Sequence, residues 1–317
     1  MKKVIIALIL SIISILLNIL FSKGFILNYN KEIIANILLF IRIPKIITII
    51  SSSIILALSG YIYQRLFKNP IITGHTLGIT SMGALGASFA ILFNLPNMTF
   101  LFSILFSLTL LVFLINIYKN SQNSILLLII GVFFSFFSSS IISILNIFLS
   151  NTSSKSLILY LLGSLDIYGY KYPTILLFIS IIFTIYTYKN LFFIEVSPLG
   201  REYIISKGID YDKNFIKLLI ISSISVSFVA ATIGPVGFIG LIIPNFVSFI
   251  EKKDYKNKFL LIILYSISFL SISDFISKNI IKNYNLPIGS ITSIVGVIFI
   301  LIILLKFNNK TKSMSIN

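Results

Sequence analysis

The chain has no cysteine and a single histidine, His75, among its 317 residues. Without cysteine it can form no disulfide, no thiolate metal site and no cysteine nucleophile. A lone histidine also nearly excludes a histidine-based metal site within the chain. Redox, thiol and metal chemistry are therefore disfavoured before any pattern is considered.

Charge is scarce, and negative charge most of all. The chain has nine Asp and Glu against 25 Lys and Arg, and charged residues make up 11% of the sequence. Soluble domains carry about 25% charged residues. With 57% hydrophobic residues and long uncharged runs, the sequence indicates a polytopic membrane protein of the all-α class. We attribute the net charge of +16 to basic loops that orient such a protein, not to nucleic-acid binding.

Ten segments are apolar and long enough to be membrane helices, since about 20 residues cross a hydrocarbon core. They are 4–22, 46–64, 76–94, 98–118, 124–149, 172–194, 215–233, 235–250, 259–276 and 287–305. The first follows two lysines, as in a signal peptide, but it is long and lacks a cleavage site, so we expect a retained anchor. The whole chain, 1–317, is expected to form one transmembrane domain, with a loose tail after the last span.

The distribution of basic residues predicts the orientation. Ten spans place both termini on one side of the membrane, and a cytoplasmic location puts 17 of the 25 Lys and Arg inside and eight outside. Cytoplasmic loops are typically enriched in Lys and Arg. We therefore expect both termini in the cytoplasm.

Charged residues are almost missing from the spans, and Asp274, near an outer end, is the one acid close to a membrane segment. Ion-coupled transporters place ionisable groups inside the bilayer, which disfavours a secondary transporter. A membrane enzyme needs clustered carboxylates, a Ser/His pair or a metal set, and nine acids with one histidine disfavour that class as well. Energy for any transport is expected to come from outside this chain's own ionisable groups.

Helix-breaking residues gather in the segment GPVGFIGLIIPN, 234–245, where five of twelve residues are Gly or Pro. Small residues let helix backbones approach closely in lipid. These glycines can therefore serve ordinary packing, or they can line a moving aqueous pathway at whose ends Pro235 and Pro244 start or kink helices. A second set of small residues occupies 78–88 and includes Gly83 and Gly86.

The most highly charged segment, 195–214, is predicted to lie at the cytoplasmic face. Ser197 suits a helix N-cap, Pro198 a first helical position and Gly208 a left-handed end. Leu199 and Tyr203, four residues apart, give this short helix an apolar side. It can be an interfacial linker helix or a docking element for a cytoplasmic partner.

Seven segments, in order along the chain, resemble the FecCD-type family of ABC importer permeases, which serve iron–siderophore and vitamin B12 uptake. They are IRIPKIITII (41–50), LALSGYIYQRLFKNPIITGHTLGITSMGALGAS (56–88), LYLLGSLDIYGY (159–170), LGREYIISKGID (199–210), GPVGFIGLIIPN (234–245), SDFISK (273–278) and LPIGSITSIVG (286–296). Each block alone is weak, but seven in order on ten spans are specific. Asn245 stands where the family usually has His, and Tyr203 where it usually has Ala.

The resemblance implies a type II ABC importer permease fold of about ten transmembrane helices. It also implies the partners: a second permease subunit, identical or paralogous, two ATP-binding subunits and an extracytoplasmic substrate-binding protein. The chain has no P-loop motif, so ATP and Mg²⁺ are expected on the partner subunits, and the chain itself is expected to be no enzyme and to hold no cofactor or metal. An iron–siderophore complex is the expected cargo, with cobalamin and haem as alternatives.

The resemblance also implies roles for three groups of residues. Basic residues at outer helix ends would face acids of the binding protein, with membrane-interface snorkelling as the alternative: Arg42, Lys45 and Lys278. The coupling segment would contact the ATPase through Leu199, Gly200, Glu202, Tyr203, Lys207 and Gly208. The translocation path and its helix packing would use Gly83, Gly86, Gly234, Pro235, Gly237, Gly240, Pro244 and Asn245. His75, beside the entry to the third span, can contact cargo or be a polar surface or cap residue.

Overall fold

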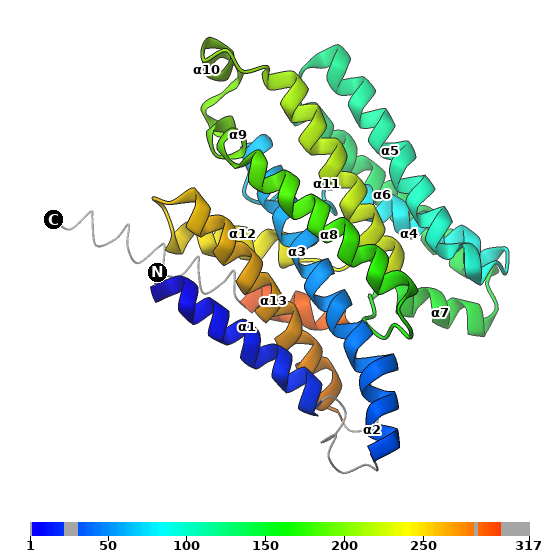
Figure 1. The fold of residues 1–317 in the computed structure, drawn as a ribbon. Helices are drawn as coiled ribbons and strands as arrows, with labels where there is room; N and C mark the ends of the chain where they lie inside the picture. Colours follow the sequence, from blue (N-terminus) through cyan, green and yellow to red (C-terminus); the bar gives the residue numbers. More distant parts are fainter. Residues whose placement is uncertain (1, 22–30, 282–284, 299–317) are drawn as a thin grey trace, which may run out of the picture.

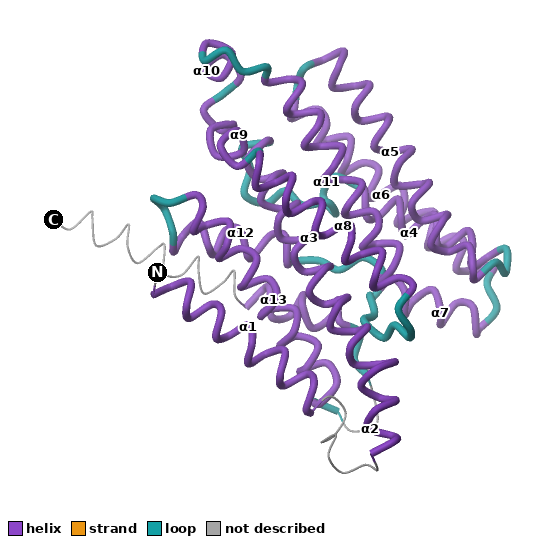
Figure 2. Tube along the Cα trace, in the orientation of Figure 1, coloured by secondary structure: helices purple, strands orange, loops and turns teal. Residues whose placement is uncertain are grey.

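The computed structural model describes residues 2–21, 31–281 and 285–298, and every regular element within them is helical (Figures 1 and 2). Seven helices are long and apolar enough to cross a membrane, and three apolar helices are shorter. Each of the ten predicted spans coincides with one of these helices, which confirms the all-α membrane class. Residues 299–305 of the tenth span and the C-terminal tail lie outside the described residues.

The long helices are α1 (Lys2–Phe21), α3 (Ile43–Leu66), α5 (Thr99–Ser121), α6 (Ser124–Phe148), α8 (Lys171–Lys189), α11 (Tyr211–Ile233) and α13 (Tyr255–Asn279). The shorter apolar helices are α4 (Ile79–Leu92), α12 (Ile239–Ile250) and Ile288–Ile298. The remaining helices lie at the membrane ends of the bundle: α2 (Lys31–Ile37), α7 (Asn151–Leu161), α9 (Leu191–Val196) and α10 (Arg201–Ser206).

Several predicted boundaries were wrong, each for a local reason. The second span begins at residue 31, because α2 continues through a π-helical turn, Leu38–Arg42, into α3. The sixth span ends at Lys189, and the apolar residues after it form the separate helix α9. The eighth begins at Ile239 and not at 235, because Gly234 has φ +78° and Phe238 φ +68°, which no right-handed helix accommodates.

Two of the apolar helices are too short to cross the bilayer alone. α4 has 14 residues and α12 has 12, so at about 1.5 Å per residue they reach roughly 21 and 18 Å of a core about 30 Å thick. Irregular chain precedes each of them, at 67–78 and at 234–238. Asn245 of α12 links that helix to the irregular chain before α4, since its side-chain amide donates to the Pro70 carbonyl at 2.7 Å. Such backbone is stable at membrane depth only when protein shields it or when it lines a cavity.

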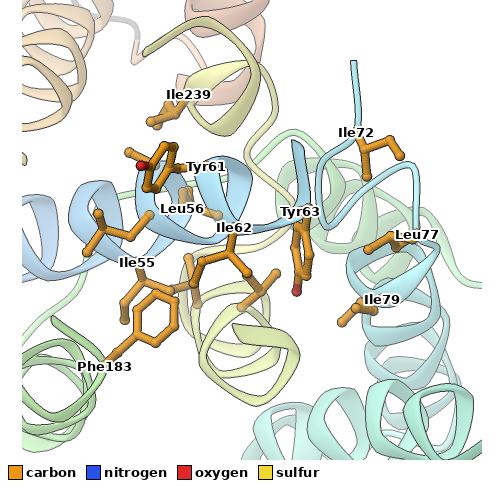
Figure 3. Packing of buried hydrophobic residues seen from close by; sticks show 14 of the residues in the cluster. Ile55, Leu56, Tyr61, Ile62, Tyr63, Ile72, Leu77, Ile79, Phe183 and Ile239 are labelled. Carbon is orange, nitrogen blue, oxygen red and sulfur yellow. The ribbon is translucent and has the colours of Figure 1, made fainter. Parts of the chain in front are cut away.

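The centre of the fold is α3, which packs against α8, α11, α12 and α13. Tyr61, Ile62 and Tyr63 are at most 1% exposed on this helix, and Figure 3 shows them with Phe183 of α8 and Ile239 of α12. The Tyr63 hydroxyl lies 3.1 Å from Ser223 Oγ on α11. A helix buried around most of its circumference is typical of the interior of a membrane bundle.

Buried serines and Asn18 lie between the helices. Many serine hydroxyls donate to carbonyls of their own helix, as Ser222 does to Leu218 at 2.6 Å. Between α1 and α13, Asn18 donates to the carbonyl and hydroxyl oxygens of Ser271, at 2.7 and 2.8 Å. Serine hydroxyls that bond to carbonyls of their own helix are small enough to let neighbouring helices approach.

Candidate functional site

The glycines singled out in the sequence are contact points between helices. A Cβ on Gly60 of α3 would lie 1.9 Å from the carbonyl oxygen of Gly240 on α12, and a Cβ on Gly240 would lie 2.6 Å from the carbonyl of Leu56. On α4, a Cβ on Gly83 would lie 2.7 Å from Ser107 Oγ, and one on Gly86 would lie 2.3 Å from the Phe102 carbonyl. Two helix crossings, α3 with α12 and α4 with α5, therefore have no room for a larger residue at these positions.

Gly234 and Gly237 differ from each other in their surroundings. Gly234 has φ +78°, and a Cβ there would lie 2.2 Å from the carbonyl of Tyr160. Gly237 has no atom of another residue within 4 Å of a built Cβ. Gly234 therefore serves the turn and its packing, whereas Gly237 faces open space.

Gly237 lines a cavity of about 670 Å³ at the surface of the bundle. The loop before α4, the end of α7, the segment before α12 with the start of that helix, and the last described helix form it: Thr73, His75, Thr76, Leu161, Leu162, Pro235, Gly237, Phe238, Leu241, Gly289, Ser290, Ser293 and Ile294. None of these lining residues is acidic or is a lysine or arginine. Cavities of about 300–1,000 Å³ suit ligands of drug size, so this neutral surface can accommodate a bulky solute.

The predicted path residues thus fall into three groups. Pro235 and Gly237 line the cavity, as does His75. Gly86, Gly234 and Gly240 lie at close backbone contacts, and Gly83 lies against the hydroxyls of Ser103 and Ser107. Pro244 is buried inside α12, and Asn245 fixes the loop before α4 through its bond to Pro70.

The loop that carries His75 is held by hydrogen bonds between its main chain and side-chain hydroxyls. The Thr73 amide donates to Thr76 Oγ1 at 2.8 Å, and the carbonyl of His75 accepts from Ser135 Oγ at 3.0 Å. Gly78 follows with φ +77° and leads into α4. The bond from Ser135 uses the main chain of His75, which leaves the exposed imidazole to line the cavity.

The cytoplasmic segment is not the single helix expected from Ser197 onward. Residues Ser197–Leu199 form one 3₁₀ turn, Gly200 has φ +110° and ψ 160°, and α10 begins only at Arg201. A residue at such a φ cannot continue a helix. Ser197 is buried, and its hydroxyl donates to Ile194 at 2.9 Å in place of capping. Gly208 does end the helix with φ +76°, as predicted.

An apolar patch is nevertheless presented on this segment. Leu199 is 60% exposed and Tyr203 and Ile205 are each 48% exposed, whereas Ile204 faces the protein at 1%. Glu202 and Lys207 are exposed around the patch. Arg201 holds α10 to the start of α11 through Asp212, at 2.6 Å between Nη2 and Oδ2. The segment therefore presents large apolar side chains on a fixed support.

Sequence reasoning assigned no role to Glu195, the first residue of the charged segment 195–214. Its carboxylate accepts from Tyr61 OH at 2.6 Å, from Arg65 Nη2 at 2.7 Å and from Lys258 Nζ at 2.5 Å. Burial raises the pKa of Glu195, but the hydrogen bonds from Lys258 and Tyr61 and the charge of Arg65 outweigh burial, so that pKa lies below its usual range. One feature of the sequence could have indicated this site: an acidic residue directly after an apolar run, together with two basic residues at inner ends of predicted helices.

At the opposite end of the bundle, the predicted docking residues pair within the chain. Lys45, 4% exposed, forms an ion pair with Asp274. Lys278 pairs with Asp166 and lies 3.9 Å from Asp274. Arg42, 6% exposed, donates to the carbonyl of Ile19.

Asp166 belongs to the loop between α7 and α8 and remains exposed. Burial of part of the group raises its pKa, but the charge and hydrogen bond of Lys278 outweigh burial and hold the pKa of Asp166 below its usual range. Asp166, Asp274, Lys278 and Asn285 line a cavity of about 270 Å³. This end of the bundle thus holds a compact charged site in which Lys278 lies beside the exposed acid.

Comparison with known proteins agrees with this architecture. The model of the FecCD transport family matches residues 3–306. The petrobactin import permease FatD of Bacillus anthracis is 26% identical, over 84% of this chain and 80% of that protein. The molybdate import permease MolB of Haemophilus influenzae is also 26% identical, over 81% and 77%.

A solved structure of a metal-chelate type ABC transporter, in an inward-facing conformation, has the same fold. Its TM-score is 0.88 at 20% sequence identity, and the match covers 96% of this chain and 99% of that one. Together with the family match across nearly the whole sequence, this places the ten helices in a known architecture. The chain belongs to the FecCD transport family and is a permease subunit of an ABC importer.

Proposed function

We propose that the chain carries an iron–siderophore chelate across the bacterial inner membrane, as one of two permease subunits around a shared path. The observation that carries this proposal is the neutral cavity of about 670 Å³ that His75, Pro235 and Gly237 help to line. Its size suits a bulky chelate, and a surface without charged side chains binds such a solute weakly enough to release it. The petrobactin relative supports the same cargo class.

Molybdate is the second candidate, because MolB is as similar to this chain as FatD is. A small oxyanion would leave most of the cavity empty, and no cation lines it among the described residues. The cavity therefore favours the chelate. Cobalamin and haem are bulky as well and remain alternatives of the same kind.

The proposal assigns a role to each end of the chain. The Leu199, Tyr203 and Ile205 patch would contact one of two ATP-binding subunits, with Gly200 and Gly208 shaping the segment and Glu202 and Lys207 at its edge. At the other end, Lys278 and its neighbours Arg42 and Lys45 would meet a substrate-binding protein. ATP and Mg²⁺ would be bound by the partner subunits, and both termini would lie in the cytoplasm.

Reconstitution tests the cargo directly. The chain, its permease partner, its ATP-binding subunits and its binding protein are placed in vesicles, and uptake of ⁵⁵Fe-labelled ferric catecholate and ferric citrate-type chelates is measured with and without ATP. We expect ATP-dependent iron uptake that requires the binding protein. Labelled molybdate, cobalamin and haem serve as competing cargoes, and transport of one of these without iron uptake would overturn the proposed substrate. An ATPase subunit defective in hydrolysis is the matched control.

A further inference from the structure

Two carboxylates join the same two helices, α3 and α13, at opposite ends of the bundle. At the cytoplasmic end, Glu195 of α9 binds Arg65 of α3 and Lys258 of α13. At the outer end, Asp274 of α13 binds Lys45 of α3 and lies 3.9 Å from Lys278. The two helices also pack along each other between these points.

Both bridges are largely removed from water. The side chains of Lys45, Lys258 and Asp274 are exposed by 5%, 6% and 2%, whereas those of Glu195 and Arg65 are exposed by 17% and 27%. Removing one partner of a buried ion pair is costly, because an uncompensated charge is left inside the protein. Separation of α3 from α13 at either end would carry a cost of that kind, so the two helices are expected to move together.

Glu195 differs from Asp274 in one respect that matters for transport. It belongs neither to α3 nor to α13 but to α9, which leads directly into the segment bearing Leu199 and Tyr203. Displacement of that segment by a bound subunit would therefore pull on both helices through one carboxylate. The hydroxyl of Tyr61 adds a third connection, again to α3.

The same helix α3 reaches the cavity region. Leu56 and Ser59 line a small space behind the main cavity, together with His75, Gly237 and Phe238. Gly60 rests on Gly240 of α12, whose preceding segment lines the main cavity. Arg65 and Gly60 are five residues apart on one helix, so a shift at the Glu195 bridge would reach the wall of the path without an intervening loop.

We propose that Glu195 is a positioning residue that transmits movement of the coupling segment to α3 and α13, which the Asp274 bridge makes into a single unit reaching the outer face. The inference rests on the proposed transport function and adds a route between its two ends. It assigns Glu195 a role in coupling hydrolysis to movement, separate from binding of the ATPase subunit, which belongs to the Leu199 and Tyr203 patch.

The test uses the complete reconstituted importer and two readouts. The first is cargo uptake per ATP hydrolysed, which in Glu195→Gln is expected to fall about fivefold or more, a typical size for loss of coupling between two sites. The second is the rate of maleimide labelling at Asn279→Cys, at the outer end of α13, with and without ATP. Because the chain has no cysteine of its own, this label reports one site, and its response to ATP is expected to disappear in Glu195→Gln.

Further variants separate coupling from folding. Glu195→Asp keeps the charge and should restore part of the coupling, and Tyr61→Phe, which leaves both ion pairs, should lose less than Glu195→Gln. Addition of Arg65→Gln to Glu195→Gln should add little, as for residues of one network. Glu251→Gln, which removes an ion pair with Lys3 on the same side of the protein, is the matched control and should behave as wild type.

An assembled Glu195→Gln importer with wild-type uptake per ATP and a wild-type labelling response would overturn the inference. The labelling readout needs no transported cargo, so it also distinguishes two failures. If the wild-type importer moves no iron chelate but shows ATP-dependent labelling that Glu195→Gln abolishes, the substrate assignment is wrong and the role of Glu195 stands.

Discussion

Gly60 and Gly240 bring α3 and α12 into backbone contact, since a Cβ on Gly60 would lie 1.9 Å from the Gly240 carbonyl oxygen. This crossing sets the position of a 12-residue helix that cannot span the membrane alone. The Gln64 side chain, one turn further along α3, donates to the same carbonyl at 2.9 Å. Two small residues and one amide therefore fix the segment that carries Pro235 and Gly237 into the cavity.

Gly60→Ala is expected to destabilise the protein by about 1–3 kcal/mol, the usual cost of overpacking, because the two backbones must separate to admit a methyl group. Thermal unfolding in detergent measures the change. Gly237→Ala is the matched control, since no atom of another residue lies within 4 Å of its Cβ position. Equal melting temperatures for Gly60→Ala and wild type would contradict the close approach of α3 and α12 at this residue.

The cytoplasmic patch predicts where the ATP-binding subunit binds. Tyr203→Glu and Leu199→Asp place charge on side chains that are 48% and 60% exposed, and they are expected to weaken association with that subunit at least tenfold, as loss of a buried aromatic or aliphatic anchor does. Co-purification and basal ATP hydrolysis measure the effect. Lys213→Gln, an exposed change on the same side, should leave both unchanged. Normal association of the two patch variants would place the contact elsewhere.

At the outer end, Lys278 lies between an internal acid, Asp166, and the expected acids of a binding protein. Lys278→Glu should lower hydrolysis stimulated by the binding protein and leave basal hydrolysis largely intact. Asp166→Asn should raise the hydrolysis stimulated by the binding protein, because it releases Lys278 from its internal partner and removes a negative charge that repels an acidic surface. Most of either effect should appear in the association rate and should shrink at high salt. Lys155→Glu is the control at an exposed outer position.

A result opposite to the one expected for Asp166→Asn would give Lys278 a different role. If Asp166→Asn reduces stimulation as much as Lys278→Glu does, the ion pair itself is required, and Lys278 acts by holding the loop between α7 and α8. Arg42 and Lys45 are buried, so charge reversal at either is expected to lower the melting temperature as well as stimulation. Melting curves separate these two outcomes.

Acid should destabilise the protein through Glu195 and Asp166. Both carboxyl groups have folded-state pKa values below their ordinary values of 4.5 and 3.8, so their contribution to stability is complete above those values. It is lost as pH falls through the lower folded-state pKa values, because the unfolded chain then binds more protons. The melting temperature should be level between about pH 6 and 8 and fall below about pH 4.5. The melting temperature of Glu195→Gln should fall less steeply in acid. An unchanged slope would count against the ion pairs of Glu195 with Arg65 and Lys258.

Sequence reasoning found the spans because a run of apolar residues is a local property. It could not find the Glu195 bridge, whose members Arg65 and Lys258 are 130 and 63 residues away. The sequence placed Asp274 at an outer end but gave no reason to pair it with Lys45 of another helix. Glycine spacing indicated close packing without naming Gly60 as the partner of Gly240, because the crossing depends on how two separated helices pack.

The break at Gly200 shows a different limit. Ser197, Pro198 and Gly208 each carry a correct local preference, and Gly208 does end a helix. The prediction ran through Gly200 because glycine is tolerated inside helices at a cost of about 1 kcal/mol. Burial of Ser197 against Ile194 removed the expected cap, so tertiary packing decided between two locally acceptable conformations.

His75 offers the sharpest test of the cavity. Its main chain holds the loop through Ser135, so His75→Asn and His75→Phe should leave folding and basal ATP hydrolysis intact. Both should change chelate uptake, since they remove the imidazole from a lining of hydroxyl and apolar groups, and the bulkier apolar Phe should reduce the maximal rate more than Asn. Ile71→Phe is the matched control: Ile71 belongs to the same loop, is 64% exposed and does not line the cavity. Wild-type uptake in both His75 variants would mean that cargo does not pass along this wall.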